Sequence, residues 1–197
     1  MSDRLPDMQR AVANASRLAA SVHELQRSDD DDDDAALLVH VTVNEGAGAA
    51  NDAARYVTDE RSDISSVRPM LRSMRASVTA ESKALLQPLQ PPSASGSKEK
   101  VWPCPGPNPF HDTDLVPYLR ERGIVQVVIC GIATTGVVLS TLQGALDVGL
   151  HTVVVSDACM DPDPSLHQAM LSYFAKRGQV LTTDEITQGS ALRDLLH

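Results

Sequence analysis

The leading candidates for a nucleophile, base or metal ligand in this sequence are its three cysteines and two of its six histidines. They are Cys104, Cys130, Cys159, His111 and His167. None of them forms a His-x-His, His-x-x-x-His or Cys-x-x-Cys pair, which are the spacings typical of metal sites. We therefore expect no metal and no cofactor, and we interpret both histidines as surface residues.

A cysteine nucleophile stays open as one alternative. Cys130 falls in a predicted buried strand, where a thiol normally packs as a small hydrophobic group. Cys159 is better placed, because it follows Asp157 at the predicted carboxyl end of a strand. Cys104 stands between prolines, and we expect it to be exposed. The nearby acidic cluster (Asp157, Asp161 and Asp163) is explained more simply by helix capping and turns than by metal binding.

The first half of the chain predicts fewer elements than the second. Helical spacing of apolar residues indicates an amphipathic helix over residues 8–25, which an acidic loop over 28–35 ends. Residues 35–43 predict a buried strand that contains His40 as a core residue. Short helices are expected over 63–74 and 79–86, a Pro/Ser/Gly-rich loop over 87–97, and a short strand over 98–102. The prolines from Pro103 onward exclude a regular ladder.

The last third alternates strictly between helix and strand. It predicts helices at about 113–122, 134–148 and 165–176, and strands at 125–130, 151–156 and 179–181. Asp112 or Thr113 is a candidate cap for the first of these helices, and Gly123 and Gly149 are candidate helix ends. This alternation predicts a single α/β domain over residues 1–197, a doubly wound parallel sheet flanked by helices on both faces.

The charge and composition of the chain argue against some classes of binding partner. The formal net charge of -9 argues against nucleic acid and against an anionic membrane. The sequence has no apolar run long enough to span a membrane and no signal-peptide pattern, and its cysteine count is odd. We expect a cytoplasmic protein.

An ordered set of motifs covers residues 110–183. Phe110-x-x-Thr-x-Leu is followed by Gly-Ile at 123–124, by Gly-Ile-Ala-Thr-Thr-Gly-Val-Val-Leu-Ser-Thr at 131–141, by Asp-x-Gly at 147–149, and by Asp-Ala-Cys-x-Asp at 157–161. In this order the motifs resemble the isochorismatase-like cysteine hydrolase family. The resemblance implies a Rossmann-like three-layer α/β/α fold, homo-oligomers, and hydrolysis of small amides, N-carbamoyl compounds or isochorismate.

The family's catalytic triad is not retained at the matching positions. It comprises an Asp after the first strand, a Lys after the third, and a nucleophilic Cys at the start of the helix predicted at 134. The Cys position falls on Val137 and the Lys position on Pro105. Asp7 stands in an Asp-x-Gln string like that of the family, but no strand precedes it, so we interpret the match as accidental. The resemblance therefore predicts a pseudoenzyme with respect to thioester chemistry.

The family's central first strand is also missing from this sequence. Its absence would leave ladder groups of two buried strands without partners. Three explanations stay open. The chain is part of a longer protein, the second and fourth strands of the family pair directly, or a neighbouring subunit covers the gap.

The turn before the predicted helix at 134 keeps the backbone of an anion hole. The resemblance implies a cis peptide bond between Ile132 and Ala133, with amides aimed at a cavity and hydroxyls from Thr134 and Thr135. We expect a small carboxylate or carbonyl ligand at a site formed by Phe110, Gly131, Ile132, Ala133, Thr134, Thr135 and Val137. The leading hypothesis is a binding or assembly role. The alternative is an active hydrolase of a small amide or ester with a non-standard nucleophile.

Overall fold

Five parallel strands in two sheets carry the fold in the computed structural model, which describes residues 5–28, 36–43, 89, 99–104, 106–188 and 191–196. Strand β1 (Leu38–Val43) pairs with β2 (Glu99–Cys104). The second sheet has the order β3-β4-β5, formed by Gln126–Ile132, His151–Met160 and Gln179–Leu181. The predicted α/β class with a parallel arrangement is confirmed.

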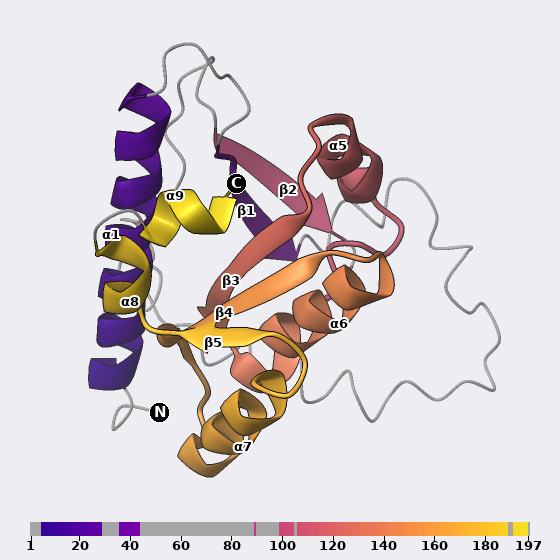
Figure 1. Cartoon of the computed structure of the whole chain (residues 1–197). Helices are drawn as coiled ribbons and strands as arrows, with labels where there is room; N and C mark the ends of the chain where they lie inside the picture. Colours follow the sequence, from indigo (N-terminus) through magenta and orange to yellow (C-terminus); the bar gives the residue numbers. More distant parts are fainter. Residues whose placement is uncertain are drawn as a thin grey trace, which may run out of the picture.

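Helices cover both faces of the β3-β4-β5 sheet (Figure 1). On one side lie α1 (Leu5–Ser28), α8 (Thr183–Thr187) and α9 (Ala191–Leu196). On the other lie α6 (Leu139–Asp147) and α7 (Pro164–Phe174), with α5 (Leu115–Glu121) packed beside α6 against β1 and β2. The short π-helix η4 (Thr134–Val138) runs directly into α6. This layering is the predicted three-layer α/β/α arrangement.

Helix α1 forms because its apolar side chains recur at helical spacing. Its buried residues face β4 and α8: Ala11, Val12, Ala15, Leu18 and Val22. The helix ends at Ser28, directly before the aspartate block, so the predicted helix at 8–25 is confirmed and extended at both ends. Near its end, His23 contacts the buried carboxylate of Glu99, and His40 lies 3.5 Å from the same carboxylate. His40 is half-buried beside a carboxylate, so it is not a purely apolar core residue.

Several predicted strand boundaries were wrong. Strand β1 begins at Leu38 rather than 35, and β3 ends at Ile132 rather than 130. Strand β2 continues through Pro103, which pairs with Thr42. The proline is tolerated because, among the described strands, β2 has a neighbour on one side only. Strand β4 runs to Met160 rather than 156, because an irregularity between Ile129 and Gly131 shifts the register and resumes pairing at Gly131 with Cys159. As a result Asp157 lies inside β4, not at its end.

The observed helix ends agree with the predicted ones more closely than the strand ends do. Gly123 and Gly149 both adopt positive φ, of 66° and 84°, as expected of residues that terminate helices. The cap of α5 differs from the prediction, since the N-cap position is Asp114. Thr113 still contributes, because its hydroxyl accepts a hydrogen bond from the Leu115 amide at 3.3 Å.

The two sheets do not join edge to edge. Within the described residues β1 pairs only with β2, and β3 pairs only with β4. Direct pairing of β1 with β3, one of the three explanations for the missing first strand, is therefore wrong. Helix α1 nevertheless contacts both sheets, through His23 with Glu99 and through Asn14 with Asp157. The acidic loop at 29–34, the helices predicted at 63–74 and 79–86, Pro105 and all of the 87–97 loop except Leu89 lie outside the described residues.

Candidate functional site

The strand–turn–helix junction at residues 131–135, called the 131–135 turn below, has the predicted backbone. Strand β3 ends at Ile132, the Ile132–Ala133 peptide bond is cis, and η4 begins at Thr134. Gly131 adopts a φ of 149°, which L side chains rarely take. Ala133 and Thr134 are buried, whereas Ile132 is 36% exposed. Thr135 and Val137 are half-buried, so solvent reaches one side of the turn.

A carboxylate of the chain itself occupies part of the expected anion hole. Asp161 Oδ2 accepts hydrogen bonds from the Thr135 amide at 2.8 Å and from Thr135 Oγ1 at 2.6 Å. Its Oδ1 accepts from the Asp163 amide at 3.2 Å, and Asp161 is only 4% exposed. The expectation that the Thr135 amide and hydroxyl face a ligand was therefore wrong. Pairing of Ile132 with Met160 places the next residue, Asp161, beside the turn.

A hydroxyl–imidazole pair lies directly beside this contact. Thr134 Oγ1 and His167 Nδ1, on α7, are 2.8 Å apart and share a hydrogen bond. Thr134 is fully buried, and His167 is half-buried one turn into the helix. The prediction of a surface histidine was therefore wrong for His167. Two consecutive threonines of the turn are thus held by the loop and helix that follow β4.

Val137, which the sequence predicts to stand at the family's nucleophile position, is apolar and packed. Val137 is half-buried against a core cluster that includes Ile129, Val138 and Leu142. Phe110 packs in a different cluster, with Leu115 and other residues near α5, and the described contacts do not place it against the turn. The structure therefore unites Gly131, Ile132, Ala133, Thr134, Thr135 and Val137, but not Phe110.

The remaining triad positions supply no catalytic pair in the described part of the chain. Asp7 lies in the first turn of α1, where it forms an ion pair with Arg10. It does not follow a strand, in agreement with an accidental motif match. Pro105 is outside the described residues.

The three thiols are poor nucleophiles. Cys104 and Cys159 are buried, with exposed fractions of 0% and 5%, so the predicted exposure of Cys104 was wrong. Burial raises the pKa of both thiols, and the nearby Cys130 raises that of Cys159 further. Cys130 was expected to be buried but reaches solvent from β3. Dense protein around the thiol still desolvates it and raises the pKa of Cys130 to about 11.

Cys130 should therefore react slowly in spite of its exposure. A pKa raised from 9.0 to about 11 keeps the thiol protonated at neutral pH, so its thiolate fraction is roughly 100-fold below that of an ordinary cysteine. We expect alkylation by iodoacetamide, followed by mass spectrometry of the intact protein, to accelerate about tenfold per pH unit from pH 7 to pH 10. A cysteine peptide alkylated in parallel is the reference. Equal rates for peptide and protein at pH 7 would contradict this expectation.

The other aspartates of the cluster have structural roles, as predicted. Asp163 caps α7 by accepting from the amides of Ser165 and Leu166. Asp157 accepts from the amide and hydroxyl of Thr183, and from Asn14. Among the described residues, no group of three His, Cys, Asp or Glu side chains could hold a metal ion.

Sequence reasoning missed two contacts of this site, Asp161 with Thr135 and His167 with Thr134. Each pair is separated by tens of residues, 26 and 33 respectively. The one signal available was the predicted adjacency of two parallel strands, which brings both carboxyl ends to one edge of the sheet. The exact register, which depends on the irregularity in the pairing of β3 with β4, could not be inferred.

Comparisons with known proteins agree in pointing to one family. A family model described as Isochorismatase domain matches residues 1–186. The phenazine biosynthesis protein PhzD1 of Pseudomonas aeruginosa is 32% identical over 207 aligned residues, which cover 93% of this chain and 95% of that protein. The uncharacterized isochorismatase family protein YecD of Escherichia coli O157:H7 is 36% identical over 78 residues, 39% of this chain.

The coverage of the relatives differs widely. The match spans 42% of the length of YecD, and likewise 42% of the uncharacterized isochorismatase family protein YwoC of Bacillus subtilis. Among solved structures, a cysteine hydrolase from Pseudomonas syringae pv. phaseolicola 1448A superposes with a TM-score of 0.63 at 17% identity, over 95% of this chain and 84% of that chain. This likeness establishes the fold alone.

No helix in the described part of the chain is long and apolar enough to cross a membrane.

Proposed function

Because the chain belongs to the isochorismatase family, we propose that it binds a small carbonyl or carboxylate compound at the 131–135 turn without forming a thioester. The observation that carries this proposal is Val137. A valine at the family's nucleophile position has no lone pair or exchangeable proton, and its side chain packs against the core. The high pKa of Cys130 and the burial of Cys104 and Cys159 leave no thiolate to replace it among the described residues.

The position of the turn in the fold supports a bound carbonyl compound. It places backbone polar groups at the carboxyl edge of a parallel sheet, the usual position of ligand sites in open α/β folds. Ile132 and Val137 add partly exposed apolar surface beside it. One relative, of Pseudomonas putida, is named a maleamate amidohydrolase, and another, of Pseudomonas chlororaphis, a probable isochorismatase. Both names concern small compounds with carbonyl groups, which supports this ligand class.

A titration followed by amide NMR tests binding. Benzamide should shift the amide resonances of residues 133–137, and resonances of the outer face of α1 should stay unchanged. No ammonia should be released over hours at 25 °C. If the protein is folded and the resonances of the turn do not move, the proposed site is refuted.

Restoring the thiol should not restore a hydrolase. In Val137→Cys the nucleophile position is filled, but Pro105 still stands at the position of the family's Lys, and the candidate for its Asp, Asp7, lies in the first turn of α1. Such groups typically contribute about 10²–10⁴-fold each. We therefore expect amide turnover by the variant to stay within about tenfold of the wild-type background. Alkylation of the new thiol serves as the control for its accessibility. Turnover with a burst of acyl-enzyme would contradict the interpretation.

One observation favours a second candidate function. The hydrogen bond between Thr134 Oγ1 and His167 Nδ1 resembles the nucleophile–base arrangement of hydrolases. Thr134 is fully buried, however, so a substrate could reach this pair only after a local rearrangement. Hydrolysis of a small ester that His167→Gln abolished, with unchanged folding, would establish this second function in place of simple binding.

A further inference from the structure

Strand β3 has a neighbouring strand on one side only in the described part of the chain. It pairs with β4, while β1 pairs with β2. Successive N–H and C=O groups of a strand point alternately to its two sides, so about half of those of β3 point away from β4. We call this side of the strand the open edge of β3. No turn or loop of the described residues forms a backbone hydrogen bond with it.

The open edge of β3 faces β1 within one layer of the fold. On one face of the layer, Leu38 of β1 and Val128 of β3 pack against the cluster that contains α1. On the other face, Val39 and Val127 pack against the cluster that contains α5 and α6. Neighbouring side chains of a strand point to opposite faces, so the two strands lie between the same helices (Figure 1). They are nevertheless not in close backbone contact, as strands paired at about 4.8 Å would be.

The side chains of β3 keep an exposure that a further strand would remove. Val153 and Val154 of β4, which has strands on both sides, are 1% and 0% exposed. Val127 and Val128 of β3 are half-buried although helices cover both faces, and Cys130 is exposed. Because each Å² of apolar surface removed from water contributes about 25 cal/mol, this residual surface favours an added strand.

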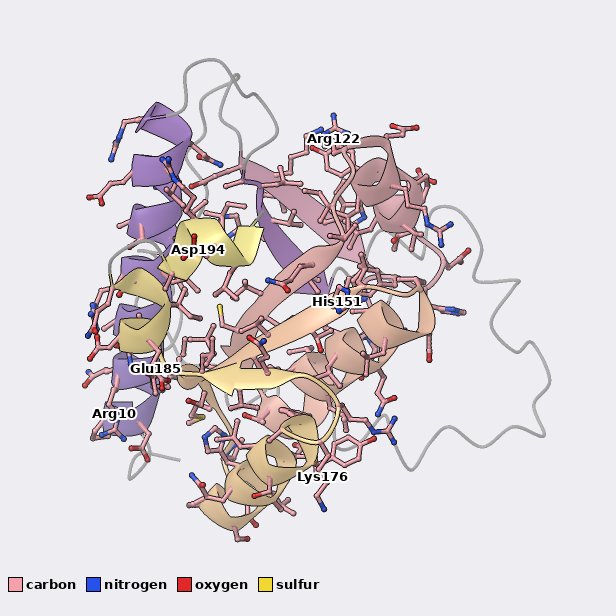
Figure 2. All side chains as sticks on the ribbon, viewed as in Figure 1. Arg10, Arg122, His151, Lys176, Glu185 and Asp194 are labelled. Atoms are coloured by element: carbon pink, nitrogen blue, oxygen red, sulfur yellow. The ribbon has the colours of Figure 1, made fainter. Side chains whose placement is uncertain are left out.

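The surroundings of the open edge define what it accepts. The strands β1 and β3 have six and seven residues, which sets the length of an added strand. A strand with helices on both faces is normally a run of valine, isoleucine and leucine. Arg10, Arg122 and Lys176 point outward from the helices and offer no partner to a charge inside the layer (Figure 2). His40 of β1 is the polar exception, and it lies beside the Glu99 carboxylate.

We propose that the open edge of β3 binds an extended, uncharged segment of another polypeptide, which adds a strand between β3 and β1. Main-chain hydrogen bonds give such a complex its affinity, and the apolar faces towards α1 and α5 select its side chains. A folded second copy does not fit, because α1 covers one face of the layer while α5 and α6 cover the other. Binding of this segment is independent of a ligand at the 131–135 turn.

Hydrogen exchange of the protein alone, followed by amide NMR, is the first test. We expect about half of the amides of residues 126–132 to exchange at least about tenfold faster than those of Val153 and Val154, which have strands on both sides. Slow exchange along the whole of β3 in dilute protein would show that the chain itself covers the edge, and would overturn the proposal. Slow exchange that appears only in concentrated protein would assign the edge to a second copy and overturn it as well.

A pair of peptides is the second test. The probe is an acetylated and amidated peptide with the sequence of residues 150–156, because this part of β4 is itself a strand buried between two others. The control is the same peptide with Val154→Pro, which removes a donor and interrupts a strand. The probe should slow the fast amides of β3 at least about tenfold, and the proline peptide should leave them unchanged. Equal effects of the two peptides, or no effect of either, would refute strand addition.

Two matched variants locate the binding. Cys130→Lys places a cation at an exposed position of β3, as natural edge strands do to block pairing, and should abolish protection by the probe. Val125→Lys adds the same charge just before the strand, at a position that is 63% exposed, and should keep that protection. Equal losses in both variants would assign the effect to net charge and contradict the proposed edge. If Cys130→Lys does not fold, the peptide pair on the wild-type protein decides alone.

Discussion

Replacing Phe174 by alanine should lower the free energy of unfolding by about 3–5 kcal/mol. Phe174 is fully buried at the end of α7, in the cluster that contains Ile129, Val154 and Leu142. It also meets Tyr173 edge to face, with ring centroids 6.1 Å apart. The truncation would leave a cavity between α7, α6 and the sheet, because a helix fixed at both ends by strands cannot collapse fully into it.

Urea unfolding at 25 °C measures this effect, and thermal unfolding should show a midpoint lowered by roughly 10 °C. Leu166→Ala in the same helix is the control, since Leu166 is 47% exposed and should cost about 1 kcal/mol or less. Because α7 also carries His167, the amide resonances of the turn should broaden in the Phe174 variant. Equal losses from both substitutions would show that α7 is not anchored by Phe174.

Asp157→Ala should cost about 3 kcal/mol, because its carboxylate joins three elements. Oδ1 accepts from the amide and hydroxyl of Thr183 at 2.7 Å and 2.8 Å, and Oδ2 accepts from Asn14 Nδ2 at 3.0 Å. Thr183 is fully buried, so both of its donors would be left unsatisfied. The contact links α1, β4 and the start of α8.

The variant Asp157→Asn removes the negative charge but keeps one side-chain oxygen that can accept a hydrogen bond. We therefore expect it to lower the free energy of unfolding by about half as much as Asp157→Ala. The matched control is Asp184→Ala, which removes an exposed ion pair with Arg17 and should cost less than about 0.5 kcal/mol. Urea denaturation of the three variants gives the comparison. A loss for Asp157→Ala as small as that for Asp184→Ala would mean that α8 is held by its apolar contacts alone.

The elements of the last third could be predicted closely because each has its own local signals. Apolar periodicity placed α6, α7 and β5, and Gly123 and Gly149 placed two helix ends at which a left-handed backbone is needed. The short helices α8 and α9 were missed, since five or six residues carry too little periodicity. Thr182 with Glu185 forms a capping box that could have revealed α8.

The structure changed the interpretation of the site more than that of the fold. The motif at 131–141 predicted the cis peptide bond and the helix start, and both are confirmed, whereas the strand runs two residues beyond its predicted end. It also suggested free donors at Thr135, but Asp161 occupies them. The valine at 137 was evident from the residues alone, whereas its packing against the core was not.

The sequence by itself therefore determined the class of fold and the family, and it predicted the loss of the family's cysteine, because these depend on residue types and on local periodicity. Only the tertiary structure decided which groups meet at the turn. Contacts such as Asp161 with Thr135, and His167 with Thr134, join residues 26 and 33 positions apart. They exist because β3 and β4 pair in one particular register, with Ile132 beside Met160, which brings the loop and helix that follow β4 next to the start of η4.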